Sequence, residues 1–327
     1  KIGDLWEIGM VSEGLGYCYR SLGQCKKSME IYRKYLDLCY KTNNTYGIFS
    51  AYIELAVNQI KIGDYDQAFY LLDKVLKTPG INDSAFNHCY ALTMLGLVET
   101  EKANYRKAVK SLHAAEKIDR ENNFVKNYTS IIYPYLADAC IKQAQAQHTG
   151  GSHSSPVYAS TDKGQGFGWR KRKQYRYLSA LCRKALRETR PWAANYGAAL
   201  RVRANYYALR DKKRRAKIYY EKSIRHAKKY RLRYELAKTY YEYAGFLSSY
   251  NEEKARCSYL EAYRLFEEID NKDYLQRCAG HLGVNDFPPG INDETRNILA
   301  SSNRNRERLA LERRMEAVAT TARHISS

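Results

Sequence analysis

Apolar and small residues recur in a fixed order along the first half of the chain, with a period of about 40 residues. In the second unit, Leu55 and Ala56 lie in a stretch whose apolar positions have helical spacing, and Gly63 follows eight residues after Leu55. Tyr65 and Ala68 then begin the next such stretch. The leucine position recurs 40, 40 and 41 residues apart, at Leu15, Leu55, Leu95 and Leu136. This order predicts pairs of helices joined by tight turns.

Small residues at these positions have a packing role in an antiparallel pair of helices. A small residue in the first helix, such as Gly96, lets the second helix approach closely, and Gly63 tolerates the backbone of a reversing turn. Ala68 falls where the two backbones come nearest, so a bulky residue there is expected to overpack the pair and cost ~1–3 kcal/mol. The pattern therefore predicts helical hairpins stacked side by side.

Further hairpins are expected after an interruption. A stretch rich in Gly and Ser predicts a flexible loop over 148–169, and helices are expected to resume near Gln174. Ala216 and Ala255 then repeat the small position 39 residues apart. Pro134 predicts that the first helix of the fourth unit starts there or is kinked. About six hairpins without a strand pattern predict an all-α, right-handed α-solenoid.

The C-terminal residues follow a different pattern, which begins after the sequence DFPPG. Apolar residues spaced 4, 3, 4 and 3 apart predict a coiled-coil seam at Leu311, Met315, Val318, Ala322 and Ile325. Such a seam favours dimerisation or a connection to a further domain. The expected organisation is therefore repeats over 1–147, the loop 148–169, basic repeats completing the array over 170–283, a linker over 284–302 and a connector helix over 303–327.

The order Leu-Gly, Tyr, Gly-x-Tyr-x-x-Ala and then a large apolar residue resembles the tetratricopeptide repeat over residues 5–145. The period of about 40 residues exceeds the ~34 usual for that repeat, which predicts longer helices or longer loops between repeats. The resemblance implies a groove, lined by the first helix of each hairpin, that binds a protein or peptide partner. By repeat position, the predicted groove residues are Tyr17, Arg20, Val57, Lys61, Leu97, Glu101, Asp138 and Lys142.

A second resemblance concerns the middle region of large bacterial signalling ATPases. The segments that carry it are YELAKTYYEYAGFL, SYLEAYRLFEEIDNKDYLQR and RERLALERRMEAVATTARHISS. In that family a STAND or AAA-type ATPase precedes the repeats, and a GAF domain with a kinase, cyclase or phosphatase output follows them. The resemblance implies a piece of a longer chain that contacts its flanking domains and relays a change through its C-terminal helix. Its motifs are packing motifs, so they assign no catalytic residue.

The net charge of +20 is concentrated in one segment. Between Arg170 and Arg233, 23 Lys and Arg residues stand against three acidic residues. The densest runs predict a patch for an anionic partner at Arg170, Lys171, Arg172, Lys173, Arg210, Lys212, Lys213, Arg214 and Arg215. An acidic protein surface, a nucleic acid or an anionic membrane surface would fit, and the lack of a groove-reading motif favours the protein. Alternatively, these residues form an ordinary solvated helix face.

Motifs for catalysis and metal binding are missing from the sequence. No P-loop, HExxH, GxSxG or kinase signature occurs, and the eight cysteines show neither CxxC nor zinc spacing. The cysteines are therefore expected to be buried free thiols. No apolar run approaches the ~20 residues of a membrane span. We expect a cytoplasmic interaction and regulatory module without enzyme activity, metal or cofactor in this segment.

Overall fold

The computed structural model describes residues 4–148 and 167–282, with side chains described over 7–147 and 172–282. This part of the chain contains helices and short connections and no strand. Residues up to Leu275 belong to one compact unit. The helices are α1 (Asp4–Ser21), α2 (Cys25–Lys41), α3 (Thr45–Ile62), α4 (Tyr65–Lys77), the 3-10 turn η1 (Ile81–Asp83), α5 (Ala85–Glu101), α6 (Tyr105–Asn122), α7 (Lys126–Thr129), α8 (Ile132–His148), α9 (Phe167–Thr189), α10 (Ala193–Leu209), α11 (Lys213–Lys229), α12 (Arg233–Leu247), α13 (Glu252–Ile269) and α14 (Lys272–Leu282).

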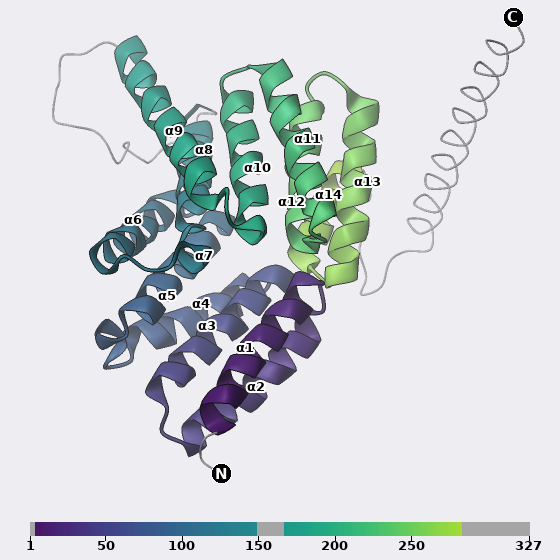
Figure 1. Cartoon of the computed structure of the whole chain (residues 1–327). Helices are drawn as coiled ribbons and strands as arrows, with labels where there is room; N and C mark the ends of the chain where they lie inside the picture. The colour runs from purple at the N-terminus through teal and green to yellow at the C-terminus, as the bar shows by residue number, and fades with distance from the viewer. Residues whose placement is uncertain (1–3, 149–166, 283–327) are drawn as a thin grey trace, which may run out of the picture. The chain divides into compact units, whose positions relative to one another are not determined.

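Successive helices pack as hairpins, and each hairpin packs on the next (Figure 1). The hairpins are α1–α2, α3–α4, α5–α6, α8–α9, α10–α11 and α12–α13. The prediction of an all-α solenoid of helical hairpins is confirmed. The first helices of the hairpins are 15 to 18 residues long, which accounts for the period of about 40 residues.

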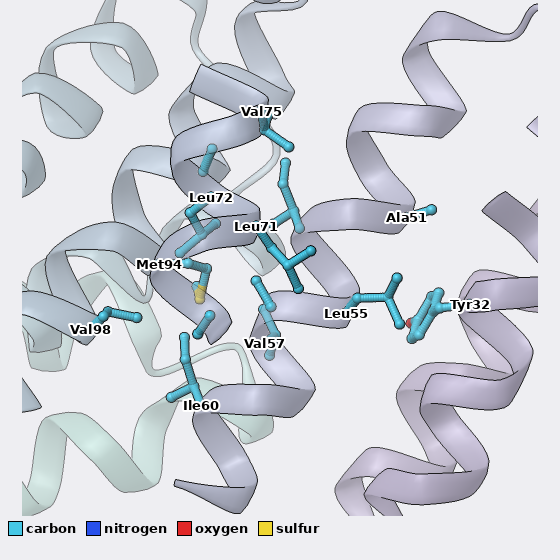
Figure 2. Packing of buried hydrophobic residues seen from close by; sticks show 14 of the residues in the cluster. Tyr32, Ala51, Leu55, Val57, Ile60, Leu71, Leu72, Val75, Met94 and Val98 are labelled. Carbon is cyan, nitrogen blue, oxygen red and sulfur yellow. The ribbon is translucent and has the colours of Figure 1, made fainter. Parts of the chain in front are cut away.

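Small residues permit the close approach of the two helices in each hairpin. A Cβ atom added at Gly16 of α1 would lie 2.5 Å from the Tyr32 ring of α2, and one at Gly96 of α5 would overlap the Leu112 side chain of α6. Ala68 of α4 is fully buried, as its place in the pattern predicts. Figure 2 shows Leu55 of α3 pointing toward Tyr32 within the core that joins the first hairpins. The small residues of the repeat pattern therefore lie where two helices pack closely together.

Residues with positive φ end the first helix of several hairpins. Gly63 closes α3 with a φ of 84°, and the carboxylate of Asp64 then accepts a hydrogen bond from the Gln67 backbone N–H at 3.0 Å. This N-cap restarts the chain as α4 at once. Ala103 takes the same role after α5 with a φ of 59°, although it carries a Cβ atom. Ala144, by contrast, lies buried inside α8, so the small residue of the fourth unit marks no turn.

The fourth hairpin departs from the others at both ends. Helix α8 begins at Ile132, so Pro134 lies in its first turn, where a missing backbone N–H breaks no helical hydrogen bond. This confirms the alternative in which the helix starts close to the proline. Helix α9 begins at Phe167, ahead of the predicted Gln174, and residues 149–166 of the predicted loop lie outside the described residues.

The predicted linker (284–302) and connector helix (303–327) lie outside the described residues, and so does the seam of Leu311, Met315, Val318, Ala322 and Ile325. Their roles remain predictions.

Candidate partner-binding site

The eight predicted groove residues, which we call the groove face, differ in their exposure. Tyr17 is exposed, Lys61 and Lys142 are half-buried, and the remaining five side chains are buried. Those five are Arg20, Val57, Leu97, Glu101 and Asp138. Three of them contact charged side chains of other helices: Arg20 contacts Glu54, Glu101 contacts Lys238, and Asp138 contacts Arg201. The repeat pattern could not show this, because it gives the position of a residue on its helix and not what covers that position.

A buried ion pair ties α5 to α12, far along the chain. The Lys238 ammonium lies 2.5 Å from Oε1 of Glu101, and each side chain is 1% exposed. The Tyr274 hydroxyl donates a hydrogen bond to Oε2 of the same carboxylate at 3.0 Å. Burial alone would lower the pKa of Lys238, but Glu101 and the nearby carboxylates of Asp138 and Glu242 raise it above its usual value. Glu101 is therefore part of the internal structure of the array, and a partner would have to displace Lys238 to reach it.

Arg201 of α10 forms the centre of a second group of buried charges. Its Nε donates to Oε1 of Glu235 at 2.7 Å, and its Nη1 lies 2.8 Å from Oε2 of Glu242. Lys142 of α8 lies 2.8 Å from Oδ2 of Asp138 and 3.7 Å from Glu242. Burial alone would raise the pKa of Asp138, but the positive charges of Lys142 and Arg201 hold this pKa below its usual value. These contacts join α8, α10 and α12.

The charges of this face balance one another. With Lys61, the residues just described comprise four acids (Glu101, Asp138, Glu235 and Glu242) and four bases (Lys61, Lys142, Arg201 and Lys238). The Lys61 ammonium lies 3.6 Å from the centre of the Tyr234 ring. Burial lowers the pKa of Lys61 to about 7, against the opposing effect of Glu235. A set of charges that is nearly balanced and, apart from Lys61, paired within the chain offers little attraction to a charged partner.

The predicted anionic patch is exposed wherever the structure describes its side chains. Those of Arg170 and Lys171 lie outside the described residues, and the exposed ones are Arg172, Lys173, Arg210, Lys212, Lys213, Arg214 and Arg215. The structure brings Arg172 of α9 and Arg210 at the end of α10 to the rim of one cavity. The remaining five do not line this cavity.

The cavity between α9 and α10 has a volume of about 640 Å³, and we call it the arginine cavity. Its lining comprises Arg172, Tyr175, Arg176, Ser179, Arg183, Tyr206 and Arg210. None of these four arginines forms an ion pair with any residue that the structure describes. Arg176 and Arg183 are not among the residues of the predicted anionic patch. Their spacing from Arg172, at i+4 and i+11, places all three on one helix face and was the available signal.

The first turn of α11 concentrates positive charge where helices favour acidic residues. Lys212 is the N-cap residue and makes no side-chain capping hydrogen bond, and Lys213, Arg214 and Arg215 follow it. The backbone N–H groups of a helix N-terminus already carry partial positive charge, so each base there is unfavourable by a few tenths of a kcal/mol. The positive charges of residues 212–215 therefore lie where they reduce the stability of α11.

Two negative findings limit the chemistry available to the described residues. No group of three or more His, Cys, Asp or Glu side chains comes together there in a way that could hold a metal ion. No helix among the described residues is long and apolar enough to cross a membrane. All eight cysteines are free thiols, and six of them are buried as predicted, whereas Cys18 and Cys257 are exposed.

The helical hairpins define the class of this chain as an α-solenoid. No known protein family and no curated protein match the sequence. Among solved structures, a thermophilic TPR protein of Thermus thermophilus is similar, with 15% identity and a TM-score of 0.48 over 72% of this chain and 98% of that one. A STAND signal-transduction ATPase of Pyrococcus horikoshii with a tetratricopeptide-repeat sensor has 17% identity and a TM-score of 0.44 over 84% of this chain and 38% of that one. The TPR2AB domain of yeast Sti1, in a complex with pHSP90, has 12% identity and a TM-score of 0.35 over 85% of this chain and 98% of that one.

Proposed function

We propose that this chain is a non-catalytic interaction module that binds an acidic segment of a protein partner. The binding surface is the set of exposed bases on α9 to α11, which we call the basic surface: Arg172, Lys173, Arg176, Arg183, Arg210, Lys212, Lys213, Arg214 and Arg215. The observation that carries the proposal is the arginine cavity, where four arginines face one space without an acidic partner among the described residues. Such an excess of one charge attracts and orients an oppositely charged partner.

The positive charge at the start of α11 also supports the proposal that the basic surface binds an acidic partner. Bases at a helix N-terminus cost stability, and the contacts of Lys213 and Arg215 with the Tyr250 and Tyr207 rings bring no negative charge to offset this, so their presence agrees better with binding than with an ordinary solvated face. The groove face offers no comparable excess, because Glu101, Asp138 and their neighbours already have partners within the chain.

A nucleic acid is the alternative occupant of the basic surface. Proteins that bind single strands combine bases with exposed aromatic rings on which nucleobases stack. In the arginine cavity Tyr206 is 2% exposed, and its ring lies beside the guanidinium groups of Arg203 and Arg210. The Tyr206 ring is therefore not open for stacking, and the half-buried ring of Tyr175, the other aromatic residue of the lining, already lies 5.3 Å from the Arg210 guanidinium group. An acidic peptide therefore suits the site better.

The wider role that we propose is regulatory. The resemblance of three segments to bacterial signalling ATPases supports a parent protein in which this array contacts flanking domains and responds to its partner. The seam between Leu311 and Ile325 would then relay the response or dimerise the chain. The parent sequence on either side of residues 1–327 provides the direct check of this architecture.

Binding of a fluorescent peptide of alternating Glu and Gly, followed by anisotropy over a series of salt concentrations, tests the proposed surface. We expect binding that weakens steeply with salt and is lost in a charge-reversal variant of α11. That variant changes four residues to Glu: Lys212, Lys213, Arg214 and Arg215.

A matched control reverses four exposed bases of the α1–α2 hairpin. The control residues are Lys27, Arg33, Lys34 and Lys41, all on α2 and none lining the arginine cavity. Equal losses in the two variants would mean that total charge alone attracts the peptide, and the proposed surface would be wrong. Tighter binding of a single-stranded oligonucleotide than of the peptide would favour the alternative.

A further inference from the structure

The four guanidinium groups of the arginine cavity need more than one negative charge. A carboxylate brings a single charge and is matched by one arginine in the two-pronged arrangement. A phosphate monoester brings about −1.5 to −2 charges and three strong acceptor oxygens, so it can engage several arginines at once. We infer that the arginine cavity binds a phosphate monoester carried by a serine or threonine side chain of the partner protein. This inference rests on the proposed function, since it names what the acidic partner places in the cavity.

Arginine rather than lysine lines the cavity, which supports recognition by geometry as well as charge. The segment 170–233 contains many lysines, yet the charged residues that line the cavity are Arg172, Arg176, Arg183 and Arg210. The planar guanidinium group presents paired N–H donors that match phosphate oxygens, whereas an ammonium group acts as a point charge. If positive charge were the only requirement, lysine would serve in this cavity as well as arginine.

The position of Arg210 is held by its neighbours before any ligand binds. Its Nη1 lies 3.2 Å from the Tyr206 hydroxyl, and its guanidinium group lies 5.3 Å from the centre of the Tyr175 ring. An arginine that is already fixed loses less conformational entropy when a ligand binds. The cavity therefore has at least one preorganised donor.

A fifth arginine lies behind the lining and is not fully satisfied. Arg203 is 9% exposed, and its Nη1 donates to the Ser179 backbone carbonyl at 3.2 Å. Its guanidinium group also lies 5.0 Å from the centre of the Tyr206 ring. The Nε of Arg203 is buried and has no hydrogen-bond acceptor in the described part of the chain. A buried arginine behind the wall adds positive potential to the cavity, since its nearest described contacts are neutral.

The shape of the site favours a phosphorylated chain over a free nucleotide. From Arg172 to Arg183 the lining extends about 16 Å along α9, which is longer than one phosphate group requires. A volume of about 640 Å³ lies within the usual range for ligand sites and leaves room for residues beside the phosphorylated one. Of the two aromatic residues in the lining, Tyr206 is buried and Tyr175 is half-buried beside the Arg210 guanidinium group, so neither ring is fully open to a nucleobase.

The test compares three pools of fluorescent peptides with random flanking residues and a fixed centre of phosphoserine, glutamate or serine. At about 150 mM salt we expect the phosphoserine pool to bind at least about tenfold more tightly than the glutamate pool, because more charge-assisted hydrogen bonds form. In the variant Arg176→Gln/Arg210→Gln this ratio should fall to about two or less. Both residues are exposed, so the variant should keep the wild-type circular dichroism spectrum and melting temperature.

The matched control, Arg214→Gln/Arg225→Gln, removes the same charge from exposed positions of α11 outside the cavity. It should weaken the phosphoserine and glutamate pools by the same factor and keep their ratio. A ratio near one in the wild-type protein would overturn the phosphate inference and leave the proposed function standing. A lack of binding by both pools at low salt would overturn both. Stronger competition by ATP than by the phosphoserine pool would identify a free nucleotide as the ligand and refute the inference.

Discussion

The ion pair between Glu101 and Lys238 allows the closure of the groove face to be measured. Both side chains are 1% exposed, and 137 residues of chain separate them. Removing one member leaves the other charge buried, so we expect Lys238→Met and Glu101→Met each to lower the free energy of unfolding by about 3 kcal/mol.

The double variant should cost far less than the two single variants together. With both charges removed, the main remaining loss is the acceptor of the Tyr274 hydroxyl, which costs about 1–2 kcal/mol. We therefore expect about 2 kcal/mol for the double variant, against about 6 kcal/mol if the single costs were additive. Urea denaturation at pH 7, followed by circular dichroism, gives these free energies.

An exposed pair at the same distance provides the control. Lys102 lies 2.5 Å from Oδ1 of Asp66, with the two side chains 36% and 90% exposed. The corresponding variants, Lys102→Met and Asp66→Asn, should each cost less than about 1 kcal/mol. Additive costs at Glu101 and Lys238, or single costs as small as those of the control, would show that α5 and α12 are not held together in the way described.

Three further predictions concern charge and turns. Lys61 has a pKa near 7 in the folded chain and near 10.5 when unfolded, so the unfolded state binds more protons between these pH values. Relative to the variant Lys61→Met, the free energy of unfolding should therefore rise from pH 7 to pH 9 by at most about 1.4 kcal/mol per pH unit. Parallel pH profiles of the two proteins would refute this. Gly63→Ala should lower stability by at least about 1–2 kcal/mol in thermal denaturation, because its φ is 84° and a Cβ atom would lie 2.7 Å from Oδ1 of Asn271; an unchanged melting temperature would contradict the turn argument. Ala103→Gly should raise stability by about 0.5–1 kcal/mol in the same assay, because glycine adopts a φ of 59° without strain, whereas a loss would show that the Ala103 methyl group packs favourably.

Packing within hairpins could be predicted from the sequence because it depends on residues close along the chain. Gly16 and Tyr32, or Gly96 and Leu112, are 16 residues apart and meet in every structure that forms the hairpin. The burial of the groove face depends instead on how far the array turns between α5 and α12. That angle results from many small packing contacts, and no local motif reports it. Lys238 and Glu101 therefore gave no signal in the sequence that they would meet.

The basic surface could be predicted from the sequence only in part. The excess of bases between Arg170 and Arg233 was visible, and so was the helical spacing of Arg172, Arg176 and Arg183. The contribution of Arg210 to the same cavity required the packing of α9 against α10, which sequence spacing does not give. Composition therefore located the charged segment, and the fold selected the residues that face one space.

Hydrogen–deuterium exchange with and without the Glu/Gly peptide tests the central claim most directly, because it locates the partner on the folded chain. We expect slower exchange over 172–183 and 210–215, with exchange over 97–101 and 138–142 unchanged. Slower exchange confined to 97–101 and 138–142 would contradict it, since the partner would then occupy the groove face in place of the chain's own side chains.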